Sequence, residues 1–88
     1  MRVVILYRPR SEHARQVEEF VHDFTHQHPD RHLEVLDVDT TEGSQLATLY
    51  EIMSYPAVLA LEDDGRLMQS WAGQFPLINE LSYYTLSV

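Results

Sequence analysis

The hydrophobic pattern of the chain begins with a run of five large apolar residues, Val3 to Tyr7. Continuous β-branched and aromatic side chains are typical of a strand that is buried on both faces of a sheet. Ala57 to Leu61 and Leu67 to Trp71 are also apolar enough to form strands, and Leu33 to Val38 is a further strand flanked by acids. The pattern predicts four strands, with Val3–Tyr7 and Ala57–Leu61 at the centre of the sheet.

Three segments between and after these strands have the pattern of helices. In the first, Ser11 is expected to cap the start and Pro29-Asp30 to stop the helix. Its apolar residues fall at helical spacing: Ala14, Val17, Phe20, Val21 and Phe24. A second helix follows the capping residues Thr40 to Ser44, and one side of it is expected to carry Leu46, Leu49, Tyr50 and Met53. A short last helix is expected to carry Leu77, Ile78 and Leu81 on its apolar side.

The connections between these elements indicate how the strands pair. Two strands joined through a helix are expected to be parallel. Asp63-Asp64-Gly65-Arg66 predicts a hairpin turn in which the glycine supplies a positive φ. The 88 residues suffice for one domain, residues 1–88. We therefore expect an α/β domain in the order β-α-β-α-β-β-α, with a four-stranded mixed sheet and three helices.

Two segments of the chain carry a resemblance to a known family. The segment Tyr50-Glu51-Ile52-Met53-Ser54-Tyr55-Pro56-Ala57-Val58 is followed by Asp64-Gly65 and then by Trp71-Ala72-Gly73. This resembles the second half of the thioredoxin-like superfamily, and the element order resembles that of glutaredoxins. The resemblance implies a thioredoxin-like fold and a cis bond between Tyr55 and Pro56. It also implies that the backbone before the proline lines a groove for an extended peptide or glutathione.

The chemistry of that family requires a Cys-x-x-Cys pair, and this chain contains no cysteine. By the resemblance, Ser11 and Ala14 stand at the two cysteine positions. Thiol–disulfide exchange needs an attacking thiolate. The chain is therefore not a thiol–disulfide oxidoreductase, and no cofactor is expected.

Charge narrows the choice of partner. The formal net charge is −8, which disfavours nucleic acid because phosphate binding needs a basic face. No apolar run reaches the ~20 residues that span a bilayer, so no membrane partner is expected and a cytoplasmic location is the default. Within this acidic chain, Arg8, Arg10 and Arg15 surround the start of the first helix. These three arginines predict a locally positive surface at the start of the first helix.

The candidate ligand or partner site combines these features, and its residues are Arg8, Arg10, Ser11, Tyr55, Pro56 and Gly73. Ser11 either caps the helix or hydrogen-bonds a thiolate, as glutathione transferases do in a similar domain. Tyr55 either forms an aromatic wall for a ligand or plugs the groove. His22 and His26, four residues apart, are weak candidates for metal ligands, although a solvated helix face explains them as well. Trp71, Tyr83 and Tyr84 either form an interaction surface at the sheet edge or pack the last helix.

These observations favour a redox-inactive binding or adaptor module that holds a protein, peptide or small anionic partner beside the cis-proline. Glutathione binding or transfer through Ser11 is the enzymatic alternative, and weak metal binding through His22 and His26 is a third. The sequence leaves open the identity of the partner and the oligomeric state.

Overall fold

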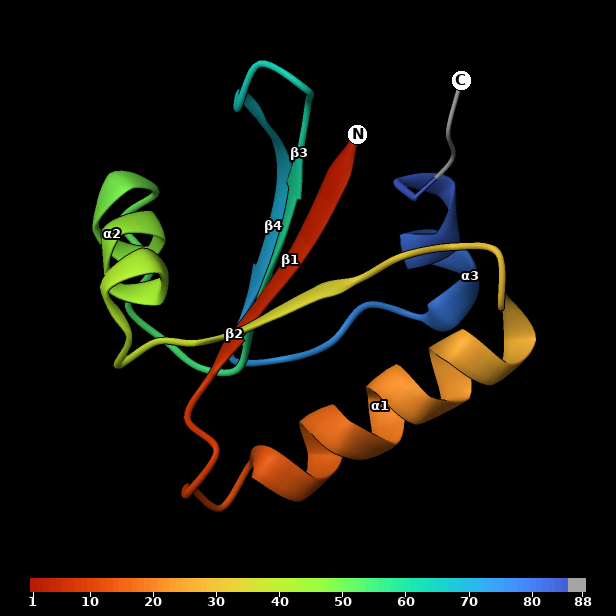
Figure 1. The fold of residues 1–88 in the computed structure, drawn as a ribbon, viewed down its shortest axis with the longest axis horizontal. Helices are drawn as coiled ribbons and strands as arrows, with labels where there is room; N and C mark the ends of the chain where they lie inside the picture. Colours follow the sequence, from red (N-terminus) through yellow and green to blue (C-terminus); the bar gives the residue numbers. More distant parts are fainter. Residues whose placement is uncertain (86–88) are drawn as a thin grey trace.

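The four predicted strands form one mixed sheet in the computed structural model, which describes residues 1–85 (Figure 1). The strand order is β2-β1-β3-β4. The elements are β1 (Arg2–Tyr7), α1 (Ala14–Gln27), β2 (Glu34–Asp37), α2 (Thr41–Leu49), β3 (Ala57–Leu61), β4 (Leu67–Ala72) and α3 (Ile78–Tyr83). The predicted element order is confirmed, and so are the central positions of β1 and β3.

The direction of each strand follows from its connection. β1 and β2, which are joined through α1, are parallel, and Leu6 lies opposite Leu36. β3 is antiparallel to both β1 and β4. Every residue of β3 is buried, as are Val3 to Leu6 of β1. This burial on both faces explains why the two strands appear in the sequence as unbroken apolar runs.

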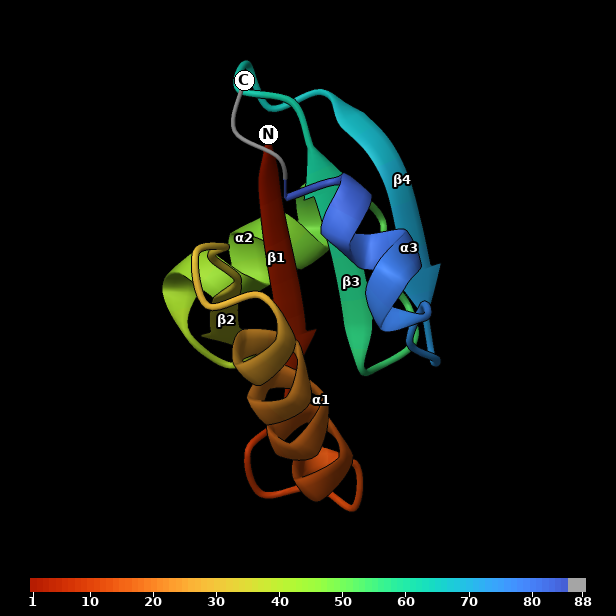
Figure 2. The same ribbon diagram turned by 90° about the vertical axis from the view of Figure 1, so that its right-hand side faces the viewer.

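Helices cover both faces of the sheet. α2 packs on one face, over a core that includes Leu6, Ala47 and Leu59. α1 and α3 pack on the other face, over a core that includes Ile5, Phe24 and Leu81. Figure 2 shows α1 and α3 in front of the sheet and α2 behind it. No helix within residues 1–85 is long and apolar enough to cross a membrane.

The start of α1 differs from the prediction. The helix begins at Ala14, and its N-cap residue is His13, whose side chain makes no capping hydrogen bond. Ser11 was expected to be the cap, and that prediction is wrong. Its hydroxyl instead donates a hydrogen bond of 2.6 Å to the carbonyl oxygen of Arg8, within a turn that precedes the helix.

The start of α2 matches the prediction, and its buried side does so in part, because Leu46 and Tyr50 pack against the core as expected. Thr40 is the N-cap, and its hydroxyl oxygen accepts a hydrogen bond from the backbone N–H of Gly43 at 3.1 Å. Leu49 and Met53, which were expected on the buried side, are 68% and 88% exposed. The helix ends at Leu49, and Glu51 then adopts a φ of +55°, so Met53 lies beyond the helix rather than on its face.

The hairpin between β3 and β4 turns on Gly65, whose φ of +91° confirms the predicted role of this glycine. An irregularity in the pairing follows, because Ala60 lies opposite Gln69 while Leu61 lies opposite Leu67. Met68 is therefore an extra residue in β4. Strict alternation along Leu67 to Trp71 predicts that these two residues share a face, and this prediction is wrong because the β-bulge places Leu67 on the α2 face, opposite Leu61.

α3 packs against the edge strand through aromatic rings. The ring centroids of Trp71 and Tyr84 are 5.7 Å apart, in an edge-to-face arrangement. Leu81 is fully buried, whereas Leu77 precedes the helix and is 77% exposed, contrary to the expectation that it lies on the apolar side. Trp71 thus packs the last helix on the sheet, which is one of the two interpretations left open by the sequence.

Substitution of Gly43 tests the close approach of α2 to the end of β2. A Cβ atom at this buried position would lie 2.9 Å from the carbonyl carbon of Asp37 and would clash with its oxygen. We expect Gly43→Ala to lower the free energy of unfolding by about 1–3 kcal/mol, although alanine has the higher helix propensity. Urea denaturation measures this change. Ser44→Ala, an exposed neighbour, is the control, and equal or higher stability of Gly43→Ala would contradict the close contact.

Substitution of Glu34 tests the ion pair that joins β1 to β2. Arg2 donates two hydrogen bonds to the Glu34 carboxylate, at 2.7 and 2.9 Å, and these hydrogen bonds lower the pKa of Glu34. A lowered pKa stabilises the folded state above the unfolded pKa of about 4.3, and this stabilisation is lost as the pH falls through the folded pKa. We expect Glu34→Gln to cost about 0.5–1 kcal/mol at pH 7, because the pair is partly exposed.

The cost of Glu34→Gln should then shrink as the pH falls below the unfolded pKa and disappear below the lowered folded pKa of Glu34, where the wild-type carboxylate is protonated in both states. Urea denaturation at several pH values measures both limits. Glu19→Gln, which removes the exposed partner of Arg15 on α1, is the matched control and should have a smaller effect at pH 7. A cost of Glu34→Gln that is the same at all pH values would exclude an electrostatic origin.

Candidate functional site

The loop between β1 and α1 is organised around the backbone of Arg8. The carbonyl oxygen of Arg8 accepts hydrogen bonds from the backbone N–H of Ser11 at 3.1 Å and from its hydroxyl at 2.6 Å. The N–H of Arg8 donates to Nε2 of His13 at 3.1 Å. Both polar backbone groups of Arg8 are therefore satisfied within the loop, which holds the residue at the end of β1 and leaves its side chain exposed.

The side chain of Arg8 links two other segments of the chain. Its Nε lies 3.7 Å from Oδ1 of Asp39, which follows β2, and its guanidinium carbon lies 5.4 Å from the centroid of the Tyr55 ring. A guanidinium within about 6 Å of an aromatic face is attracted to the ring electrons. Arg8 therefore brings the β1–α1 loop, the β2–α2 loop and the segment before β3 together.

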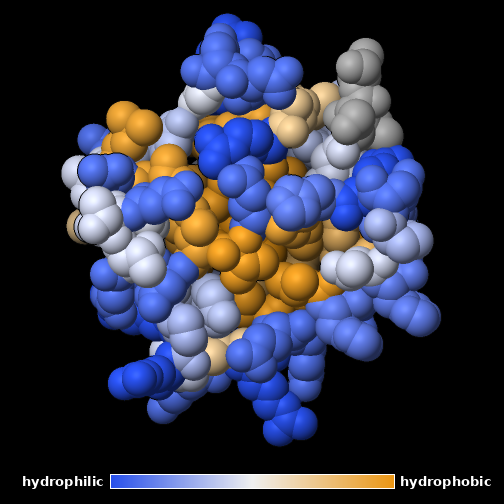
Figure 3. Space-filling model, viewed as in Figure 1, coloured by the Kyte–Doolittle hydropathy of each residue, from blue (hydrophilic) through white to orange (hydrophobic). Residues whose placement is uncertain are grey.

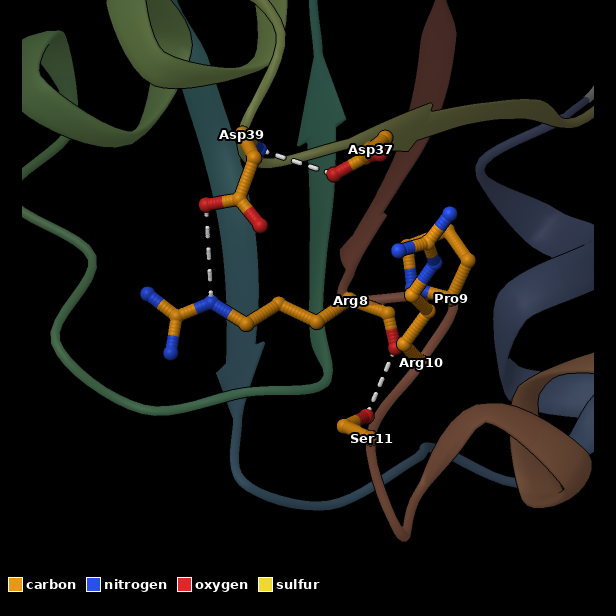
Figure 4. Close-up of a pocket in the computed structure, with 6 residues that line it drawn as sticks. All are labelled: Arg8, Pro9, Arg10, Ser11, Asp37 and Asp39. Atoms are coloured by element: carbon orange, nitrogen blue, oxygen red, sulfur yellow. Dashed lines mark hydrogen bonds and ion pairs between the residues drawn. The ribbon is translucent and has the colours of Figure 1, made fainter.

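Two hollows lie on either side of this arginine. The first has a volume of about 360 Å³ and is lined by Arg8, Pro9, Arg10, Ser11, Asp37 and Asp39 (Figure 4). The second has a volume of about 750 Å³ and lies against α2. Its lining includes Ala47, Ile52, Met53 and Tyr55, together with Arg8 and Asp39 again. Because the two hollows share Arg8 and Asp39, we treat them as one groove, called the Arg8 groove below.

Tyr55 lines the second hollow of the Arg8 groove, and Pro56 follows it directly before β3. The bond between these residues is cis. Pro56 is buried, and its carbonyl oxygen accepts a hydrogen bond of 2.8 Å from the backbone N–H of Gly73. Gly73 has a φ of +80°, a conformation that favours glycine. Within residues 1–85, the backbone N–H and C=O of Tyr55 pair with no other backbone group.

The charge of the groove differs from the prediction. The sequence predicts a locally positive spot, but Asp37 and Asp39 lie beside Arg8 and Arg10 in the first hollow, so that prediction is wrong. The reason is the parallel pairing of β1 with β2, which places the C-terminal ends of both strands side by side at one end of the sheet. The arginines that follow β1 therefore meet the aspartates that follow β2.

The two arginines also have different surroundings. Figure 4 shows the side chain of Arg8 extending toward Asp39 and away from that of Arg10. The side chain of Arg10 makes no ion pair with any residue between 1 and 85. Of the predicted site residues, Arg8 and Tyr55 contact each other, Ser11 contacts the backbone of Arg8, and Pro56 contacts Gly73.

Sequence reasoning missed several residues of the groove, among them Asp37, Asp39 and Met53. Asp37 and Asp39 could have been found from the expectation of parallel strands, because residues that follow such strands meet in space. Met53 could not, because its exposure depends on where α2 ends.

The histidine pair lies apart from the groove, on the exposed face of α1. The rings of His22 and His26 are stacked, with centroids 6.3 Å apart. Within residues 1–85, no group of three or more histidine, aspartate or glutamate side chains is arranged to hold a metal ion. The pair lacks the third ligand that a protein zinc site uses.

Comparisons with known proteins agree with this architecture. No protein-family model matches the chain, and no curated protein sequence matches it. Thioredoxin 1 from the thermophilic eubacterium Thermosipho africanus is similar in structure, with a TM-score of 0.68 and 17% identity over 96% of this chain and 93% of that chain. A structure described as a malarial protein matches with a TM-score of 0.64 and 16% identity, over 93% of this chain and 89% of that one.

These matches establish the class of fold. The chain has a thioredoxin-like fold, as its resemblance in sequence implies, and it lacks the cysteine pair of a redox-active member.

Proposed function

We propose that this protein is a redox-inactive binding module of thioredoxin-like fold, which acts in the cytoplasm and holds an extended, carboxylate-bearing segment of a partner protein in the Arg8 groove. The observation that carries the proposal is the position of Arg8, between Asp39 and the ring of Tyr55 and at the junction of the two hollows. A peptide lying along the groove would pass this side chain.

Backbone pairing supports an extended conformation for the partner. The N–H and C=O of Tyr55 have no backbone partner within residues 1–85. An extended peptide placed beside Tyr55 satisfies such groups with its own backbone, as in strand addition. Met53, which is 88% exposed beside the second hollow, offers an adaptable apolar contact for one side chain of the peptide.

The arginines support a carboxylate as the polar anchor of the partner. Arg10 makes no ion pair within residues 1–85, and a guanidinium binds a carboxylate through two parallel hydrogen bonds. Arg8 is already near Asp39, but the separation of 3.7 Å is long for a strong ion pair. An incoming carboxylate would therefore compete with Asp39 for Arg8 and meet little competition at Arg10.

The double variant Arg8→Ala/Arg10→Ala tests the proposal. The probe is an eight-residue peptide with two glutamates, compared with the same peptide carrying glutamines. Loss of charge-assisted hydrogen bonds should weaken binding of the glutamate peptide by at least about tenfold, since each is worth about 1.5–3 kcal/mol. Isothermal titration calorimetry measures the affinity. The salt dependence of binding should fall as well.

The matched control is Arg15→Ala/Arg66→Ala, which removes the same charge from two exposed positions outside the groove. Its affinity for the glutamate peptide should remain within about twofold of wild type, because screening weakens distant charges. Equal losses in the two double variants would contradict the proposal. So would peptide-induced NMR shifts confined to Trp71, Tyr83 and Tyr84, which would place binding at the sheet edge instead.

Asp39→Asn tests the competition within the groove. Asparagine has nearly the same size but no charge, so it should release Arg8 for the partner's carboxylate. We expect the affinity for the glutamate peptide to rise by about threefold or more, and the affinity for the glutamine peptide to stay unchanged. A fall in the affinity for the glutamate peptide would show that Asp39 contributes to binding rather than opposing it.

Glutathione binding through Ser11 is the alternative function, and a separate experiment tests it. The Ser11 hydroxyl donates its hydrogen to the Arg8 carbonyl oxygen, so a thiolate would have to displace that bond. Native mass spectrometry with glutathione, and with Zn²⁺ for the histidine pair, measures both ligands directly. Binding of glutathione that Ser11→Ala abolishes would favour the alternative over the binding module.

A further inference from the structure

We infer that β2 is a second docking edge, which accepts an extended protein segment carrying basic residues around one aliphatic side chain. The inference goes beyond the Arg8 groove. It rests on three observations, namely an unpaired strand edge, an apolar hollow beside it, and the sign of the surrounding charges.

The unpaired edge follows from the sheet order. β2 is the first strand of the sheet, and its only neighbour among residues 1–85 is β1. The N–H of Val38 donates to the carbonyl oxygen of Tyr7 at 3.0 Å, which fixes the side of the strand that faces β1. Alternate residues point their backbone groups to the same side, so the groups of Leu36 also face β1 and those of Val35 face away from it.

The hollow lies between β2 and α1. It has a volume of about 330 Å³ and is lined by Tyr7, Val17, Glu18, Val21, His22 and Val35. Val35 is 38% exposed at its margin. In Figure 1 the edge strand β2 lies in front of the sheet, and Figure 3 shows exposed hydrophobic surface in the same region of the molecule. A strand added beside Val35 would direct alternate side chains toward the α1 face of the sheet, and one of them could enter the hollow.

The charges around the edge select the partner. Glu18 lines the hollow, and Glu34 and Asp37 stand at the two ends of β2. Arg2 pairs with Glu34, and Arg8 and Arg10 lie beside Asp37 in the Arg8 groove, whereas Glu18 makes no ion pair within residues 1–85. Lysine or arginine on the incoming strand would complement Glu18. A second copy of this chain would instead bring the same carboxylates and a further formal charge of −8.

The experiment uses a nine-residue acetylated peptide in which lysines alternate with valine or isoleucine. Two peptide controls have glutamate in place of every lysine, or proline at the central apolar position. We expect the lysine peptide alone to bind, to shift the NMR signals of Leu33 to Asp37, and to slow hydrogen exchange of the Val35 amide. Binding of the proline peptide with equal affinity would exclude strand addition.

Two matched variants locate the site. Val35→Lys removes the apolar contact and adds a like charge, so it should weaken the lysine peptide by at least about fivefold. Met68→Lys makes the same charge change on the opposite edge strand, at a residue that is 37% exposed, and should change the affinity by less than twofold. Val35→Thr, which keeps the branched shape, serves as a second variant if Val35→Lys fails to fold. If Val35→Lys and Met68→Lys weakened binding equally, the binding would be explained by general charge attraction, and the inference would be overturned.

The two docking surfaces can be separated. Arg8→Ala/Arg10→Ala should leave affinity for the lysine peptide within about twofold, and Val35→Lys should leave affinity for the glutamate peptide within the same limit. If the binding test contradicts one of the two surfaces, the proposal for the other surface therefore still stands on its own test. A dimer in sedimentation velocity without peptide, dissociated by Val35→Lys, would show that a second copy occupies the edge and would overturn the choice of a basic partner.

Discussion

β1 and β3 lie side by side at the centre of the sheet, and helices seal both of their faces from water. Val3 to Leu6 and all five residues of β3 are buried. Burial of each large aliphatic side chain contributes about 1.5–3 kcal/mol, so these two short strands supply a large share of the favourable free energy of folding.

The candidate groove is a consequence of that arrangement. β1 ends at Tyr7 and its parallel neighbour β2 ends at Asp37, so both strands end on the same side of the sheet, where their C-termini lie. Arg8 follows one strand and Asp39 follows the other, and each is placed by its strand rather than by the contact between them. The segment that enters β3 begins at this same edge, since β3 is antiparallel to β1, and this brings Tyr55 within reach of Arg8.

The sequence predicted the two central strands well, because a strand that is buried on both faces consists of an unbroken run of apolar residues. It predicted only part of the buried side of α2, namely Leu46 and Tyr50. Leu49 and Met53 continue the apolar spacing of the helix, but the chain reverses at Glu51, and no residue type marks that position as the end. The prediction of a locally positive region is wrong for a related reason. The arginines are neighbours in the sequence, whereas the aspartates that balance them follow a different strand.

The extra residue at Met68 gives the sheet two unequal ends. In β4 it breaks the regular alternation of backbone donors and acceptors, so an approaching strand would find no continuous template there. β2 has no such interruption in its four residues, and its pairing with β1 keeps an even register throughout. Within residues 1–85, β2 is therefore the edge that offers a regular template to an added strand, and the edge at β4 offers an interrupted one.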